Sequence, residues 1–270
     1  MKTRVITAAV LVPVLLILVL AAPKILAALV FGLMMSIGAY ELLYGTGLVT
    51  HRRLVIYAAI MAFLVSIWSY TGAVHAYGVL GVLVFVMILF VEMMLDHVKV
   101  RFSMISATMV AGIIVPYLLT ALVRILMMKI GRYVIMVPFV VAFLNDAGAY
   151  FAGIRFGKHK LAPVVSPNKT LEGVAGGMIA STVGMLIYCI VLYIADFHVN
   201  VLLALLYGIV GSATGVLGDL CFSIIKRQTG IKDYGNLIPG HGGILDRFDS
   251  LMTVAPLMEV LLTLLPFAVG

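Results

Sequence analysis

The residues best suited to chemistry lie between Asp219 and Asp249. This stretch reads DLCFSIIKRQTGIKDYGNLIPGHGGILDRFD and combines aspartates, basic residues and a histidine with several glycines. Only 11% of the chain is charged, so this concentration of charge is unusual within it. Because apolar runs flank the stretch on both sides, it either lies outside a bilayer or lines a protected cavity. We therefore take it as the centre of a candidate site.

The carboxylates in this stretch suggest a metal site. Asp219, Ser223 and Lys226 follow the spacing i, i+4 and i+7, which places them on one face of a helix. Asp246 and Asp249 are three residues apart and share a face if a helix begins nearby. Several carboxylates with only one histidine nearby favour a hard, oxygen-liganded cation such as Mg²⁺ over zinc. We expect one or two divalent ions, with Asp219, Asp246 and Asp249 as the candidate ligands.

Basic side chains alternate with these carboxylates and suit phosphate oxygens that a metal leaves free. With Asp219 and Asp246 they form the predicted catalytic group for phosphoryl or nucleotidyl transfer: Lys226, Arg227, Lys232 and Arg247. The glycines beside His241 allow the backbone to bend closely around a ligand. We expect substrate contacts from Ser223, His241, Gly242 and Gly243. The competing interpretation is a solvated loop with salt bridges, but Asp219 lies within an apolar helix, where an unpaired charge is costly.

Two further polar segments precede this stretch. Asn145 and Asp146 interrupt the apolar run VPFVVAFLNDAGAYFAG, which indicates either a functional role or a hydrogen-bonded structural contact. The segment SPNKTLEG contains Ser166, Lys169 and Thr170. Thr170 is well placed to cap the helix that follows, and the three side chains together suit a phosphate group at a helix N-terminus. We include all five residues among the candidate substrate contacts.

The elements that must position these residues are membrane helices. Of the 270 residues, 64% are hydrophobic and the mean hydropathy is +1.21, against about 45–50% apolar residues in soluble domains. We predict an all-α polytopic membrane protein, with one domain over residues 1–270. The N-terminal helices occupy 1–132, and the C-terminal catalytic helices and the loops 155–170 and 226–250 occupy 133–270. About nine spans are expected, at 5–22, 25–44, 54–71, 74–95, 103–127, 133–154, 171–195, 199–225 and 251–269.

The basic residues predict the orientation of these helices. With a cytoplasmic N-terminus, most of the 18 Lys and Arg residues fall on the cytoplasmic side, and only Lys24, Lys129 and Arg132 fall opposite. This places both polar loops in the cytoplasm, at the inner face of the cell membrane. The net charge of +7 reflects this topology, so we expect no nucleic-acid partner. Among the N-terminal helices, Glu41 and Glu92 lie near predicted cytoplasmic ends, at the interface or capping a polar cavity.

The segment from Ser223 to Asp249 resembles the C-terminal signature of the phosphatidate cytidylyltransferases, or CDP-diacylglycerol synthases. The pattern S-x-x-K-R-x4-K-D…H-G-G-x-x-D-R-x-D is matched without a gap by Ser223, Lys226, Arg227, Lys232, Asp233, His241, Gly242, Gly243, Asp246, Arg247 and Asp249. SPNKTLEG is similar to a second family segment, S-P-K-K-T-x-E-G, with Asn168 replacing one lysine. The resemblance covers roughly residues 145–250.

This resemblance implies a membrane enzyme of phospholipid biosynthesis that uses Mg²⁺ to convert CTP and phosphatidic acid to CDP-diacylglycerol and pyrophosphate. Asp219 and Asp246 would hold the metal, while Asn145, Asp146 and Lys169 would line the lipid-phosphate side. A lipid phosphate is already an ionised nucleophile near neutral pH, so no strong base is needed. Two alternatives are a CTP-dependent polyprenol or lipid kinase and a cation-coupled transporter. The first helices could supply a homodimer interface or face lipid.

Overall fold

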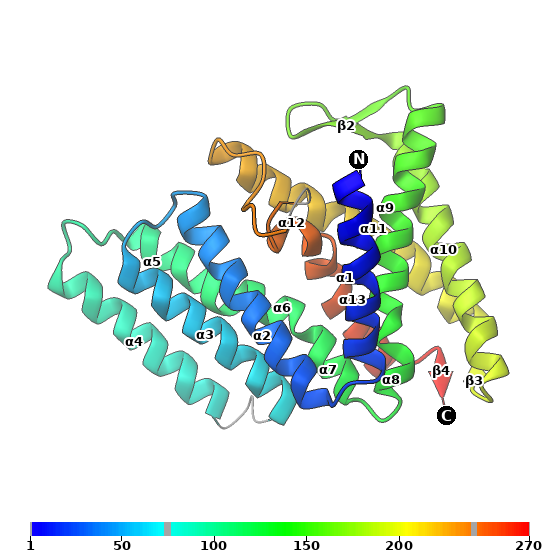
Figure 1. The fold of residues 1–270 in the computed structure, drawn as a ribbon, viewed down its shortest axis with the longest axis horizontal. Coiled ribbons are helices and arrows are strands. Elements are labelled where there is room, and N and C mark those ends of the chain that lie inside the picture. The colour runs from blue at the N-terminus through cyan, green and yellow to red at the C-terminus, as the bar shows by residue number, and fades with distance from the viewer. Residues whose placement is uncertain (1, 73–76, 239–241, 270) are drawn as a thin grey trace. The chain divides into compact units, whose positions relative to one another are not determined.

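The computed structural model describes residues 2–72, 77–238 and 242–269, with only the backbone described for residues 2–6 and 8. Nearly all of its regular structure is helical, and two short antiparallel pairs of strands are the exception in the described part (Figure 1). The all-α prediction is therefore confirmed in this coarse form. The strands are too short to form a layer of their own.

Six helical stretches of the described chain are long and apolar enough to cross a membrane. They are Lys24–Gly45, Arg52–Thr71, Phe102–Met127, Gly131–Phe156, Leu171–Ile194 and Val201–Gln228. The other three predicted spans fall on shorter apolar helices, Ala9–Leu20, Val79–Leu95 and Leu251–Leu264. Six candidate spans are therefore observed, and nine crossings stay a prediction.

The chain divides into two compact units. The first comprises Met1–Met127 and Gln228–Phe248, and the second comprises Met128–Arg227 and Asp249–Gly270. The sequence grouped residues 228–248 with the C-terminal catalytic helices, but in the structure this segment packs with the N-terminal helices. The candidate metal ligands therefore belong to different units, with Asp246 in the first and Asp219 and Asp249 in the second.

Apolar helices and one returning loop make up the first unit. In chain order these elements are α1 (Lys2–Leu20), α2 (Lys24–Tyr40), η1 (Glu41–Gly45), α3 (Arg52–Thr71), α4 (Val79–Leu95), α5 (Phe102–Met109), η3 (Val110–Ile114), α6 (Val115–Leu119), α7 (Ala121–Met127) and α12 (Leu245–Phe248). Small residues bring α2 and α3 together, because Ser66 Oγ donates to the Ala28 carbonyl at 2.7 Å and Ser36 Oγ to the Ala59 carbonyl at 2.7 Å. The segment η1 continues α2 as a single π-helical turn.

The second unit is built around α9 and α10. Its elements are α8 (Gly131–Val134), α9 (Met136–Phe156), β1 (Lys160–Ala162), β2 (Ser166–Thr170), α10 (Leu171–Ile194), β3 (His198–Val199), α11 (Val201–Gln228, whose last residue begins the returning segment of the first unit), α13 (Leu251–Leu264) and β4 (Ala268–Val269). Helices α9 and α10 lie side by side (Figure 1). A Cβ built at Gly148 would lie 2.5 Å from the Ala180 Cβ, so only glycine permits this close approach.

The predicted loop 155–170 contains a hairpin that leads into α10. Strands β1 and β2 pair antiparallel, with Lys160 opposite Thr170. Thr170 then caps the helix, since its Oγ1 accepts the Gly173 N–H at 3.1 Å. The predicted N-cap is therefore confirmed, and the hairpin fixes the position of Lys169 one residue earlier.

Candidate functional site

A pocket of about 250 Å³ in the second unit gathers many of the predicted residues. Its wall comes from the middle of α9, the end of β2, the start of α10 and one face of α11. The lining residues are Asn145, Asp146, Ala149, Tyr150, Asn168, Lys169, Thr170, Gly173, Val174, Val216 and Asp219. Five residues predicted to take part in chemistry, separated by up to 74 positions in the sequence, therefore meet around one cavity.

Asp219 is held on two sides at this pocket. Lys169 Nζ lies 2.5 Å from its Oδ2, and Ser223 Oγ donates to its Oδ1 at 3.2 Å. The second contact is consistent with the i, i+4 spacing on α11, from which the sequence predicted that the two residues share a helix face. The Lys169 and Asp219 side chains are each about one-quarter exposed, at 24% and 25%. The ion pair is therefore accessible from the pocket rather than sealed inside the protein.

Asp249 lies in the same electrostatic environment as Asp219. Burial raises the pKa of Asp249 to about 7, and the nearby carboxylates of Asp219 and Asp146 act in the same direction. The Ser250 N–H, which donates to Asp249 Oδ1 at 2.8 Å, and the Lys226 cation both lower that pKa. Burial and the two neighbouring carboxylates thus disfavour the charged form of Asp249.

Asn145 combines pocket lining with a structural contact. Its side chain is buried, and its Oδ1 accepts the Ser212 hydroxyl at 2.6 Å. A Cβ built at Gly177 would lie 2.5 Å from that same oxygen. Asp146, the next residue, is exposed, and its Oδ2 accepts the Ser250 hydroxyl at 3.5 Å. The structural interpretation that the sequence left open therefore suits Asn145 better than Asp146.

The basic end of α11 contacts the hairpin. Arg227 Nε donates to the Val165 carbonyl at 3.2 Å, while the Lys226 side chain is buried. Ser166, the first residue of β2, is partly buried and lies outside the residues that line the pocket. The Arg227 contact keeps the end of α11 close to the hairpin that carries Lys169.

In the first unit, Asp246 binds the backbone of its own loop. Its Oδ2 accepts the N–H groups of Tyr234 at 2.8 Å and Gly243 at 3.0 Å. Gly242 has a φ of +87°, and a Cβ there would lie 2.9 Å from the same oxygen, so glycine is required twice over. Asp246 is only 6% exposed, so a large part of its hydrogen-bonding capacity is used within the protein.

Sequence reasoning missed Glu41. This residue begins η1, is 4% exposed, and accepts the N–H groups of Ile244 and Leu245, each at 3.0 Å. The contact joins positions more than 200 residues apart. An acidic residue near the end of an apolar helix was its only signal in the sequence, and that signal pointed to an interfacial position.

The remaining predicted residues differ in what the structure says of them. Lys232 and Arg247 are exposed on the first unit. His241 lies outside the described residues. Of the described residues near it in the sequence, the Ile238 N–H donates to the Gly242 carbonyl at 2.9 Å. The predicted roles of these residues stay predictions.

The donor chemistry fits a hard divalent cation, although the described residues assemble no ligand cage. Among the described residues, no three His, Cys, Asp or Glu side chains are grouped closely enough to hold a metal ion together. Asp219, Asp249 and Asp146 nevertheless supply only oxygen donors, and they lie close enough together to raise the pKa of Asp249. Carboxylate oxygens are donors that Mg²⁺ prefers. Thiol or imidazole ligands are not among them.

Comparisons with known proteins identify the family. A model described as the cytidylyltransferase family matches residues 2–265. The chain belongs to this family. The resemblance read from the signature around His241 and Asp246 is therefore confirmed, and the match extends beyond the motifs to nearly the whole sequence.

Named relatives within the cytidylyltransferase family agree with this assignment. The chain is 51% identical over 132 residues to a phosphatidate cytidylyltransferase of Staphylococcus haemolyticus (strain JCSC1435). It is 48% identical over 132 residues to the protein of that name from Staphylococcus aureus (strain COL). Each alignment covers 49% of this chain and 50% of the relative, so the chain matches about half the length of these curated relatives.

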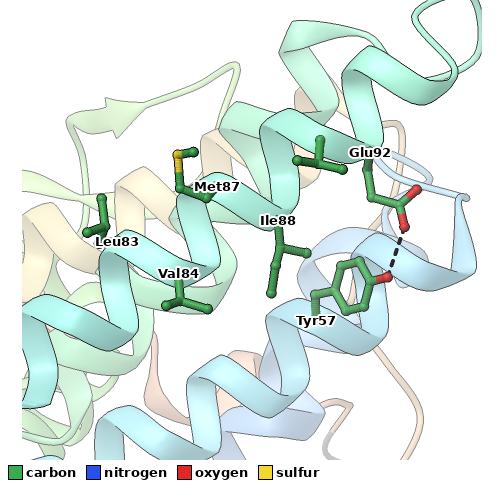
Figure 2. A pocket seen from close by; sticks show the side chains of 7 residues that line it. Tyr57, Leu83, Val84, Met87, Ile88 and Glu92 are labelled. Carbon is green, nitrogen blue, oxygen red and sulfur yellow. Dashed lines mark hydrogen bonds between the residues drawn. The ribbon is translucent and has the colours of Figure 1, made fainter.

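A second, apolar pocket lies in the first unit, and none of the predicted site residues is among the described residues that line it. Figure 2 shows side chains of α4, among them Met87 and Ile88, along this pocket, with Tyr57 and Glu92 at one end. The Tyr57 hydroxyl donates to Glu92 Oε1 at 2.8 Å, and Arg53 Nη1 lies 3.6 Å from the same oxygen. This member of the cytidylyltransferase family thus contains a second buried glutamate with partners of its own.

Proposed function

We propose that this protein is a phosphatidate cytidylyltransferase, which transfers CMP from CTP to phosphatidic acid. The observation that carries the proposal is the pocket where Lys169 pairs with Asp219 beside Asp146, within a chain that belongs to the cytidylyltransferase family. The relatives named phosphatidate cytidylyltransferase support the choice of lipid substrate. A pocket of this charge within membrane helices suits a phosphate carried by a lipid.

In the proposed reaction, an oxygen of the lipid phosphate attacks the α-phosphorus of CTP. A new P–O–P bond forms, the bond between the α-phosphorus and its bridge to the β-phosphate breaks, and the electron pair leaves with pyrophosphate. Because the attacking phosphate is already ionised, no side chain needs to remove a proton. Lys226, Arg227, Lys232 and Arg247 would neutralise the charge that develops on the leaving group.

The aspartates are proposed as ligands of Mg²⁺. Asp219 and Asp249, both in the second unit, lie in one electrostatic environment that suits this role. The assignment of Asp246, in the first unit, rests on the resemblance of its segment to the family signature. A bound Mg²⁺ supplies charge neutralisation on the triphosphate and favours departure of pyrophosphate. Lys169 would balance Asp219 and lie next to the incoming lipid phosphate, which also needs a cation near it. The oxygen-only donor set described above supports this assignment.

We also propose that the chain lies in the cell membrane with a cytoplasmic N-terminus. Six stretches meet the length and hydropathy needed to cross, and three shorter helices of apolar composition would complete nine crossings. The distribution of Lys and Arg supports this orientation. Both the hairpin at β1 and β2 and the loop before α12 would then face the cytoplasm, where CTP is available.

An assay of the purified full chain tests the reaction. Incubation with CTP, phosphatidic acid and Mg²⁺ is expected to give CDP-diacylglycerol and pyrophosphate in equal amounts, and chelation of the metal with EDTA is expected to abolish both products. Asp219→Ala and Asp246→Ala should each lower kcat/KM by about 100-fold or more, because each removes a proposed ligand of the Mg²⁺ that neutralises the triphosphate.

Asp96→Ala is the matched control for these substitutions. Asp96 is a partly exposed carboxylate paired with Lys99 in the first unit, outside the predicted site, and its loss should leave activity unchanged. Phosphorylated lipid with CDP as the products would show a lipid kinase instead. Full activity of Asp246→Ala would reject the ligand role of that residue.

A further inference from the structure

We propose that Glu41 is a positioning residue that fixes the loop carrying Asp246. The proposal rests on the proposed function for its catalytic consequence, but the contact itself is a feature of the first unit alone. Glu41 belongs to the N-terminal helices, which show no sequence motif for chemistry. It nonetheless makes the two hydrogen bonds that hold the start of α12.

Both oxygens of the Glu41 carboxylate are used. Oε1 accepts the Ile244 N–H at 3.0 Å, and Oε2 accepts the Leu245 N–H at 3.0 Å. Leu245 is the first residue of α12, so one of these amides is the first of that helix. A carboxylate bound by two N–H groups holds a backbone in one orientation more firmly than a single neutral hydrogen bond would.

The glycines around Glu41 fit this contact closely. A Cβ at Gly243 would lie 2.5 Å from Glu41 Oε1, and a Cβ at Gly235 would lie 2.6 Å from the same atom. The carboxylate therefore sits between two backbone segments of the loop. The first of these glycines belongs to the His-Gly-Gly motif, and the contact with Glu41 gives a physical reason for a residue without a side chain there.

Asp246 follows directly after the amide that Glu41 holds. Its own Oδ2 accepts the Gly243 N–H at 3.0 Å and the Tyr234 N–H at 2.8 Å. Glu41 therefore binds the amides of residues 244 and 245, while Asp246 binds those of residues 234 and 243, so both carboxylates hold the same loop. Movement of the Leu245 amide would displace Asp246, the residue proposed to bind metal, so the effect of Glu41 on catalysis would act through Asp246.

The end of α2 is shaped to present Glu41 to the loop. The π-helical turn η1, Glu41–Gly45, begins at this residue, and such turns are often found at functional sites. Gly45, at the end of η1, would place a Cβ 2.6 Å from the Tyr234 carbonyl. The loop is thus in close contact with both ends of η1, which makes this turn its support within the first unit.

Two substitutions test the contact from opposite sides. Glu41→Gln keeps the size of the side chain but replaces one acceptor with an NH₂ group, which then faces an N–H donor. Gly235→Ala leaves Glu41 intact but adds a Cβ where the carboxylate lies. Glu92→Gln is the matched control, because Glu92 is also a buried helix glutamate of the first unit and its partners are Tyr57 and Arg53 (Figure 2).

Hydrogen exchange of the full-length protein in detergent measures the position of the loop without any reaction. In Glu41→Gln, amides of residues 242–248 should exchange about 10-fold faster or more, while those of α5 and α7 exchange at the rate of the unaltered protein. Glu92→Gln should leave residues 242–248 unchanged. Equal acceleration throughout the first unit would show that Glu41 supports the fold in general, and it would overturn the proposal.

Kinetics measure the catalytic consequence. Glu41→Gln and Gly235→Ala should each lower kcat by about 10- to 100-fold, the usual cost of losing support for a metal ligand, with much smaller changes in KM for CTP. The kcat of the double variant should be no lower than that of the less active single variant, because both substitutions disrupt the same contact. An unchanged kcat in Glu41→Gln, or losses that multiply in the double variant, would overturn the proposal.

Failure of the proposed function gives a different result. If the unaltered protein makes no CDP-diacylglycerol from CTP and phosphatidic acid, the function is wrong, while the exchange experiment still reports whether Glu41 holds residues 242–248. If the unaltered protein is active and Glu41→Gln is fully active with a loosened loop, the function stands and the positioning role is rejected.

Discussion

At the scale of single residues, the pairing of Lys169 with Asp219 is the main feature of the pocket. The two side chains come from β2 and α11, and they meet at 2.5 Å with about three-quarters of each side chain buried. The pair is too enclosed to be an ordinary surface salt bridge and too open to be a purely structural one. Both members of the pair line the pocket, so we expect them to be within reach of a ligand that enters it.

Removal of Lys169 tests the importance of this pair. Lys169→Met keeps the apolar stem but leaves Asp219 without its cation, and kcat/KM for phosphatidic acid should fall by about 100-fold. Steady-state kinetics on mixed micelles give the value. Lys160→Met, at an exposed lysine of the same hairpin, is the control and should stay within about 2-fold of the unaltered protein. Equal losses in both variants would show that the general charge of the hairpin matters and the pair does not.

At the scale of elements, small residues let α9 and α10 approach closely enough to form the pocket. Gly148 on α9 and Gly177 on α10 each face a partner that a Cβ would meet at 2.5 Å, Ala180 in one case and Asn145 in the other. Interfaces between membrane helices depend on such packing, because lipid supplies little hydrophobic driving force between them. The spacing of these two helices therefore determines where Asn145 and Asp146 lie.

Gly177→Ala should separate α9 from α10 locally. The added methyl group would collide with Asn145 Oδ1, and overpacking of this kind costs about 1–3 kcal/mol of stability. Thermal unfolding in detergent should show a lower Tm. Ala175→Val adds more volume on the exposed face of the same helix and should leave the Tm nearly unchanged. If Gly177→Ala has the same Tm as the unaltered protein, the interface between α9 and α10 accommodates the added methyl group, and the prediction is wrong.

At the scale of the whole molecule, the predicted orientation places successive loops on opposite sides of the membrane. Lys129 precedes the span Gly131–Phe156, and Val164 lies in the hairpin after it. Both positions are exposed, with Val164 at 88%. One helix separates them, so they should face different compartments whatever the number of spans before them.

Cysteine labelling in intact cells tests this orientation. In a background with Cys189→Ser and Cys221→Ser, Lys129→Cys should react with a membrane-impermeant maleimide added outside. Val164→Cys should react only after the cells are permeabilised, because the positive-inside rule places the basic hairpin in the cytoplasm. The reverse pattern would invert the proposed topology. Labelling of both positions from one side would show that Gly131–Phe156 does not cross.

Local signals in the sequence were enough to predict several features. Thr170 was identified as an N-cap because a cap depends on a few neighbouring residues, and helical spacing placed Asp219 and Ser223 on one face, where the structure shows them in contact. Both contacts span four residues or fewer. The family was likewise predicted from a motif that is continuous along the chain, and the comparison with residues 2–265 confirmed it.

Features that depend on distant contacts could not be predicted in this way. Glu41 finds its partners about 200 positions away, and nothing near residue 41 indicates them. The pairing of Lys169 with Asp219 has the same origin, since only the fold brings a hairpin to the side of α11. Strands β1 and β2 were missed because three to five residues are too few to show an alternating pattern.

The order of synthesis has a consequence for Glu41. A ribosome adds about 5–20 residues each second, so the backbone that Glu41 binds is made roughly 10–40 seconds after Glu41 itself. The whole stretch from Met128 to Arg227 emerges in that interval, and it belongs to the other unit. Until residues 244 and 245 arrive, a carboxylate destined for burial must stay in contact with water, with head groups or with the insertion machinery. The first unit is thus begun early and completed only after residues 128–227 of the second unit have been made.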